Sequence, residues 1–106
     1  MKCLNITYFA EYDSKGNILS YTECDIVCVP NYIADNASGY AQSFLRWLES
    51  EDVTDDYYYS DGNHKYIICD THGFIKWLNN YITLNEKSKI ITLNTVYNKE
   101  YDTIDF

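Results

Sequence analysis

The sequence has little proline, little glycine and no long apolar run. One proline and four glycines occur among 106 residues, and the glycines are too dispersed to form a phosphate-binding loop. No apolar run approaches the roughly 18–20 residues that span a bilayer, and the opening MKCLNITYFAEYD lacks a secretory-signal pattern. We therefore expect a cytoplasmic protein without a membrane segment.

Basic residues are also scarce. Eight Lys and Arg stand against sixteen Asp and Glu, which gives a net charge of −8. Because binding to phosphates needs clustered bases, this balance argues against direct nucleic-acid binding. It favours a basic protein partner, or serves solubility alone. With 46% hydrophobic residues, the chain is expected to fold as a single domain over residues 1–106.

The first half of the chain predicts a hairpin followed by a helix. Apolar and polar residues alternate over 3–12 and again over 18–29, with the turn sequence DSKGN between them. A helix is expected over about 37–50, because apolar residues recur there at helical spacing after capping residues at 35–38.

The second half repeats this order around the hairpin turn Asp61-Gly62. A second helix is expected to be capped by Asp70 or Thr71. The expected elements are strands at 56–60, 64–69 and 89–97, a helix over 70–82, and a tail or short edge strand at 98–106.

These elements predict an α+β fold in the order ββαββαβ. We expect an antiparallel sheet of about five strands with two amphipathic helices packed on one face. The segments FLRWLES (44–50) and FIKWLNN (74–80) share a pattern, and each closes a hairpin-then-helix unit. A ββα pseudo-repeat and chance convergence of two amphipathic helices both stay open.

The four cysteines do not predict a metal site. Cys24 and Cys28 lie four apart on a predicted strand, about 13 Å from each other, whereas two thiolates on one zinc ion lie within about 4.6 Å. A site completed by Cys69 and His72 is therefore disfavoured. We predict no metal and no cofactor, and reduced, partly buried thiols, including Cys3.

The sequence also argues against catalysis. A nucleophile–base pair of Cys69 and His72 is disfavoured, because Asp70 opposes the thiolate and no Lys or Arg lies within three residues. Carboxylates are many, but none forms a marked pair in an apolar setting, and P-loop, G-x-S-x-G and H-E-x-x-H motifs are absent. We expect no catalytic residues and no enzymatic activity.

An acid-rich stretch joins the first helix to the second hairpin. Six acids and no base occur within residues 49–61, which we call the acidic segment. Negative charge at a helix C-terminus opposes the macrodipole, so this placement brings the fold no evident gain. Strand alternation exposes at least one of three consecutive tyrosines, and tyrosine is a frequent interface anchor. The predicted partner-binding residues are Glu49, Glu51, Asp52, Asp55, Asp56, Tyr57, Tyr59 and Asp61.

In size, charge and composition the chain is similar to phage DNA-mimic, anti-CRISPR and anti-restriction proteins. The resemblance implies a small acidic inhibitor that occupies the nucleic-acid-binding site of a basic partner, such as a nuclease or a CRISPR effector. For a phage-encoded chain it also implies a location in the host cytoplasm. Two alternatives stay open. One is an immunity protein that neutralises a toxin, and the other is a homodimeric or subunit interaction module that pairs through a sheet edge.

Overall fold

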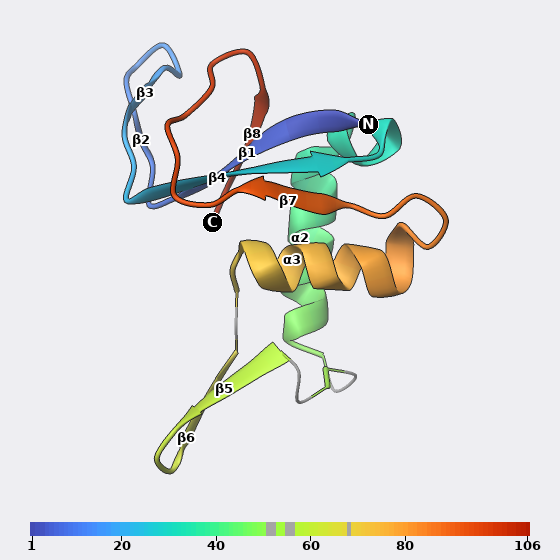
Figure 1. Ribbon diagram of the computed structural model, residues 1–106. Helices are drawn as coiled ribbons and strands as arrows, with labels where there is room; N and C mark the ends of the chain where they lie inside the picture. Colours follow the sequence, from blue (N-terminus) through green and yellow to red (C-terminus); the bar gives the residue numbers. More distant parts are fainter. Residues whose placement is uncertain (51–52, 55–56, 68) are drawn as a thin grey trace.

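A four-stranded sheet forms the centre of the fold (Figure 1). The computed structural model describes residues 1–50, 53–54, 57–67 and 69–106, without the side chains of Tyr59 and Lys65. The strands of the sheet, in spatial order, are β7 (Lys89–Thr92), β4 (Glu23–Val29), β1 (Lys2–Tyr8) and β8 (Asp102–Asp105).

The α+β class is confirmed, but the sheet is mixed and has four strands. β4 pairs antiparallel with both β1 and β7, whereas β8 runs parallel to β1 at the edge. A parallel neighbour requires a crossover connection, and the segment after β7 supplies one. The expected antiparallel sheet of about five strands is therefore corrected.

The first hairpin is interrupted near its tip. Phe9 adopts a left-handed backbone with φ of 53°, which bends the chain after β1. Beyond the bend, β2 (Glu11–Tyr12) and β3 (Ile18–Ser20) form a separate two-stranded ladder. The turn between them is held by Asp13, whose carboxylate accepts the backbone N–H of Lys15 and of Asn17.

The helices lie close to where the sequence predicts them. A short helix α1 (Asn31–Ala34), which follows Pro30, precedes α2 (Ala37–Leu48). The helix α3 (Thr71–Trp77) begins after Asp70, whose Oδ1 accepts the N–H of Gly73 at 2.8 Å. Asp70 is thus the predicted cap. The short helix α1 was not predicted, because Pro30 signals the end of a strand as readily as the start of a helix.

The last turn of the second helix is a π-helix, η2 (Leu78–Ile82). Asn79 ties this wider turn to the approach to β7. Its Oδ1 accepts the N–H of Ser88 at 2.7 Å and the hydroxyl of Thr83 at 2.8 Å, and its Nδ2 donates to the Ser88 carbonyl. Thr83 and Ser88 are both buried, so these bonds satisfy polar groups that water cannot reach.

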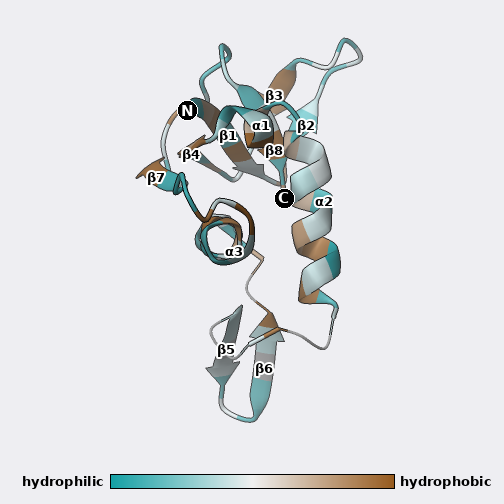
Figure 2. Ribbon diagram, turned by 90° about the vertical axis from the view of Figure 1, so that its right-hand side faces the viewer, coloured by the Kyte–Doolittle hydropathy of each residue, from teal (hydrophilic) through white to brown (hydrophobic). Residues whose placement is uncertain are grey.

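The hydrophobic core lies between the sheet and the helices α2 and α3 (Figure 2). The ring of Phe44 is at its centre, 5.6 Å from the rings of both Phe74 and Trp77 and 6.2 Å from that of Phe106. Aromatics of the two similar segments therefore meet where the helices face each other.

The two halves of the proposed ββα pseudo-repeat nevertheless differ in topology. β1 and β4 lie in the main sheet, whereas β5 (Tyr58–Asp61) and β6 (His64–Ile67) pair only with each other. The second hairpin lies apart from the sheet in both views, beyond the C-terminal end of α2 and on the side of α3 away from the sheet (Figures 1 and 2). The strands predicted at 56–60 and 64–69 are thus present at Tyr58–Asp61 and His64–Ile67, but they do not join the sheet; positions 56 and 68 lie outside the described residues.

The opposite face of the sheet is covered by residues 93–101, which we call the crossover segment. The strand predicted over 89–97 ends at Thr92 because Asn94 turns the chain with φ of 50°. Asn5, a fully buried residue of β1, then holds the segment in place. Its Nδ2 donates to the carbonyls of Asn98 at 2.7 Å and Tyr101 at 3.1 Å, and its Oδ1 accepts the N–H of Asn98 at 3.0 Å.

We predict that Asn5→Ala lowers the free energy of unfolding by about 2–4 kcal/mol, because it leaves several buried backbone groups without partners. Urea unfolding monitored by circular dichroism measures the change. Asn31→Ala is the matched control, since Asn31 is exposed and should change stability by less than about 0.5 kcal/mol. Equal unfolding midpoints for the two variants would contradict the role of Asn5.

Candidate binding surface

The structure locates part of the predicted acidic segment. Glu49 directly follows α2 and is exposed, and Asp61 is exposed at the end of β5. Asp61 pairs with His64 across the predicted turn, where Gly62 has φ of 60°. Glu51, Asp52, Asp55, Asp56 and the side chain of Tyr59 lie outside the described residues.

Tyr57 does not belong to the exposed surface predicted from the sequence. Its side chain is 1% exposed, and its ring lies 4.7 Å from the ring of Trp47, edge to face. The ammonium group of Lys76 is 5.3 Å from the Tyr57 ring centroid. Local alternation shows only that neighbouring tyrosines face opposite ways, whereas Trp47 on α2 decides which one is buried. Tyr57 therefore anchors the base of the hairpin to the helices.

Residues 58–67, which we call the hairpin arm, carry exposed apolar side chains beyond this anchor. Tyr66 is 44% exposed and Ile67 is 42% exposed. Both belong to the strand predicted over 64–69, whose apolar residues favoured burial, and Cys69 at its end is also exposed. The strand is not buried because the arm has no place in the main sheet. The arm thus combines one exposed carboxylate at its turn, Asp61, with apolar and aromatic side chains on its strands; His64 and Lys65 follow the turn in the sequence.

Few of the acids are neutralised by neighbouring bases. In the described ranges the ion pairs are Lys2 Nζ to Asp35 at 2.8 Å and the N-terminal amine to Glu86 at 4.0 Å. Within the same ranges, the side chains of Glu49 and Asp61 take part in neither an ion pair nor a hydrogen bond. Their charges are thus exposed and uncompensated there.

A second polar site was missed in the sequence and lies where β1, β4 and the start of α3 meet. It is a pocket of about 480 Å³. A hydrogen-bonded chain forms its wall: the Tyr8 hydroxyl lies 2.7 Å from Thr71 Oγ1, which donates to Asp25 Oδ2. Asp25 is 1% exposed and also accepts the N–H of Asn94 at 2.8 Å. Burial raises the pKa of Tyr8 to about 12, so its hydroxyl stays protonated at neutral pH.

Glu23 and Asp25 form a carboxyl pair at this pocket. They are two residues apart on β4, and side chains at that spacing share a face of a strand. A hydrogen bond between the two carboxyl groups, more than burial or charge repulsion, raises the pKa of Glu23. The spacing E-x-D within a predicted strand could have indicated this carboxyl pair from the sequence. Asp25, however, lies opposite Ile6 on the apolar face of the sheet, where a carboxylate is unexpected.

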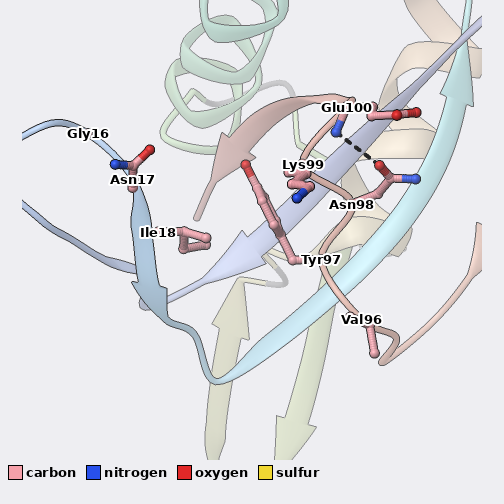
Figure 3. Close-up of a pocket in the computed structure, with 8 residues that line it drawn as sticks. All are labelled: Gly16, Asn17, Ile18, Val96, Tyr97, Asn98, Lys99 and Glu100. Atoms are coloured by element: carbon pink, nitrogen blue, oxygen red, sulfur yellow. Dashed lines mark hydrogen bonds between the residues drawn. The ribbon is translucent and has the colours of Figure 1, made fainter.

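A larger, shallow pocket of about 790 Å³ lies between the β2–β3 turn and the crossover segment (Figure 3). Ile18 and Asn17 form one wall, and Tyr97, Asn98 and Lys99 form the other. The dashed bond in Figure 3 joins Asn98 Oδ1 to the N–H of Glu100 at 3.0 Å.

The metal site and the Cys69–His72 pair considered from the sequence can be compared with the structure. Among the residues that the structure describes, no three His, Cys, Asp or Glu side chains are grouped so as to hold a metal ion. Cys69 is exposed rather than partly buried, and the remaining burial together with the charge of Asp70 raises its pKa, which disfavours the thiolate. Over the same described ranges, no helix has the length and hydropathy needed to cross a membrane.

Comparison of the chain with protein families, with curated proteins and with solved structures finds no match. The function of the protein is therefore inferred from its residues and their contacts alone.

We predict that Glu23→Gln stabilises the protein slightly at neutral pH. An acid with a raised folded-state pKa stabilises the fold below its unfolded pKa, and this contribution is lost as pH rises through the folded-state pKa. At neutral pH the ionised Glu23 is repelled by Asp25, and the amide removes this repulsion. Because Glu23 is largely solvated, we expect a gain of at most about 0.5 kcal/mol.

Thermal unfolding at neutral pH and below about pH 4 measures this effect. The gain should vanish at the lower pH, where Glu23 is itself protonated. Glu11→Gln, an exposed carboxylate outside the pocket, is the control and should show no such gain. A gain of equal size at both pH values would contradict the carboxyl-pair interpretation.

Proposed function

We propose that the protein is a non-enzymatic inhibitor that binds a basic, nucleic-acid-binding protein through the acidic segment and the hairpin arm. The observation that carries this proposal is the projecting hairpin arm, which is fixed at its base, carries the exposed carboxylate of Asp61 at its turn and is partly apolar on its strands. A nuclease or a CRISPR effector is such a partner, because it binds nucleic acid in a groove lined by basic side chains.

Several acids elsewhere in the chain have a structural role in the fold. Asp13 holds a turn, Asp70 caps α3, and Asp25 binds the crossover segment. Asp105 accepts the hydroxyl of Thr7 at 3.0 Å. The described acids of the acidic segment, in contrast, hold nothing together, which supports a role for them outside the fold.

The arm has the properties expected of a partner-binding element. A two-stranded hairpin gains little stability by itself, and exposed Tyr66 and Ile67 leave apolar surface in water. A partner that covers them would recover this free energy. Arginine side chains would pair with the carboxylates through charge-assisted hydrogen bonds and stack on exposed aromatic rings. The packing of Tyr57 against Trp47 holds the arm in place before binding, which lowers the entropic cost.

A sheet-edge interaction module is the second candidate, and the edge strand β7 favours it. Ile91 is 54% exposed there and Leu93, just beyond, is 44% exposed. The other edge, β8, exposes Asp102 and Asp105, and charged residues discourage strand pairing at an edge. A second copy or subunit would therefore pair with β7. An immunity protein would use the same acidic chemistry as the inhibitor and would differ in the identity of its target.

We predict that the triple variant Asp55→Asn, Asp56→Asn, Asp61→Asn folds normally and binds its target at least about tenfold more weakly, because close charge pairs drive such an interface. Asn at position 61 keeps a residue that favours the turn before Gly62. The immobilised variant and wild type are exposed to lysate of the source cell, and captured proteins are quantified by mass spectrometry at low and high salt.

The matched control is Glu11→Gln, Glu100→Gln, Asp102→Asn, which removes three exposed charges outside the acidic segment. A basic protein retained by the wild type and the control, lost from the triple variant and released by high salt supports the proposal. Undiminished capture by the folded triple variant refutes it. Salt-independent self-association abolished by Ile91→Lys would favour the sheet-edge module instead.

A further inference from the structure

We propose that Cys3 and Cys28 form a reversible disulfide that links β1 to β4 across the sheet. The two residues are direct partners in the antiparallel ladder between these strands. Both are free thiols, and each is half-buried, so small oxidants can reach them. This pair is independent of the proposed binding function, because it lies on the main sheet and away from the hairpin arm.

The register alone satisfies the geometry of a disulfide. Directly opposite residues of an antiparallel pair have Cα atoms about 4.5 or 5.5 Å apart, depending on their hydrogen-bonding position. Both values lie inside the range of about 4.4–6.8 Å seen in disulfides. Opposed side chains also lie on one face of the sheet. The bond therefore requires no rearrangement of the strands.

The surroundings of the two thiols agree with this placement. Burial, followed by the effect of the neighbouring Cys3 thiol, raises the pKa of Cys28, whereas the charges of the N-terminal amine and of Lys89 act in the opposite direction. Tyr101, from the crossover segment, lies on the same side, and its hydrogen bond with Cys3 raises the pKa of the Tyr101 phenol. Cys3 and Cys28 are thus in contact on a face with cations nearby.

The other two cysteines lack such a partner. Cys24 stands opposite Thr7 in the ladder and is fully buried, with its Sγ 3.8 Å from Asn5 Oδ1. Cys69 is exposed just before α3 and outside the main sheet. Oxidation is therefore selective for one of the possible pairings of four cysteines.

The oxidant in our proposal is a small disulfide such as oxidised glutathione. One thiolate of the pair attacks a glutathione sulfur, which breaks the glutathione disulfide, forms a mixed disulfide and releases one glutathione thiolate. The second cysteine, as its thiolate, then attacks the protein sulfur of the mixed disulfide and releases the second glutathione. Two electrons pass from the cysteines to glutathione, whose released thiolates take up the two thiol protons. Reduced glutathione in excess reverses both steps.

Disulfide mapping of the intact chain tests the proposal. The reduced, folded protein is incubated with oxidised glutathione, its remaining thiols are blocked with N-ethylmaleimide, and it is then cleaved before aspartates. This cleavage places each cysteine on a different peptide: 1–12, 13–24, 25–34 and 61–69. We expect a cross-link between peptides 1–12 and 25–34, an intact mass lower by two hydrogen atoms, and reversal by dithiothreitol.

Two controls keep the result decisive. The double variant Cys24→Ser, Cys69→Ser should form the same cross-link, and the same oxidation in guanidinium chloride should scramble the pairing. Stable glutathione adducts on Cys3 or Cys28 without the cross-link would overturn the proposal. A native cross-link that includes Cys24 or Cys69 in preference would overturn it as well.

Discussion

The buried amide of Asn5 is the interaction on which the arrangement of the strands depends. A polar side chain in the middle of a sheet is costly unless its donors and acceptors are satisfied. Here both ends of the amide bind the backbone of the crossover segment, at Asn98 and Tyr101. The cost of burying the amide is offset only when the segment lies across the sheet, and that position delivers β8 beside β1 in parallel orientation.

Asp25 holds neighbouring elements in place in the same way on the helix side of the sheet. Its carboxylate binds Thr71 at the start of α3 and the N–H of Asn94 at the start of the crossover segment. Two buried polar side chains on neighbouring strands thus connect the sheet to both layers around it. The net charge of the chain therefore overstates the negative charge that is accessible to a partner, because some carboxylates, such as that of Asp25, are buried in the fold. Glu49 and Asp61 are among the exposed carboxylates that make no such contact within the described residues.

Features that near neighbours decide could be predicted from the sequence. The helix at 37–48, the Asp70 cap and the Asp61-Gly62 turn each depend on residues within a few positions. Features set by distant partners could not. The orientation of β8 depends on Asn5, and the burial of Tyr57 depends on Trp47. The Glu23–Asp25 pair carried a local signal, but its partners, Thr71 and Asn94, come from far along the chain.

The parallel pairing of β1 with β8 also constrains when the protein can fold during its synthesis. Thr103 lies 98 residues from Asn5, its partner in the ladder. A ribosome adds residues at about 5–20 per second, so β1 waits several seconds for its neighbour while one of its edges stays open. During that interval β4 alone covers β1. The unpaired edge is then open to pairing with another chain, and rapid synthesis of the last segment would shorten that interval.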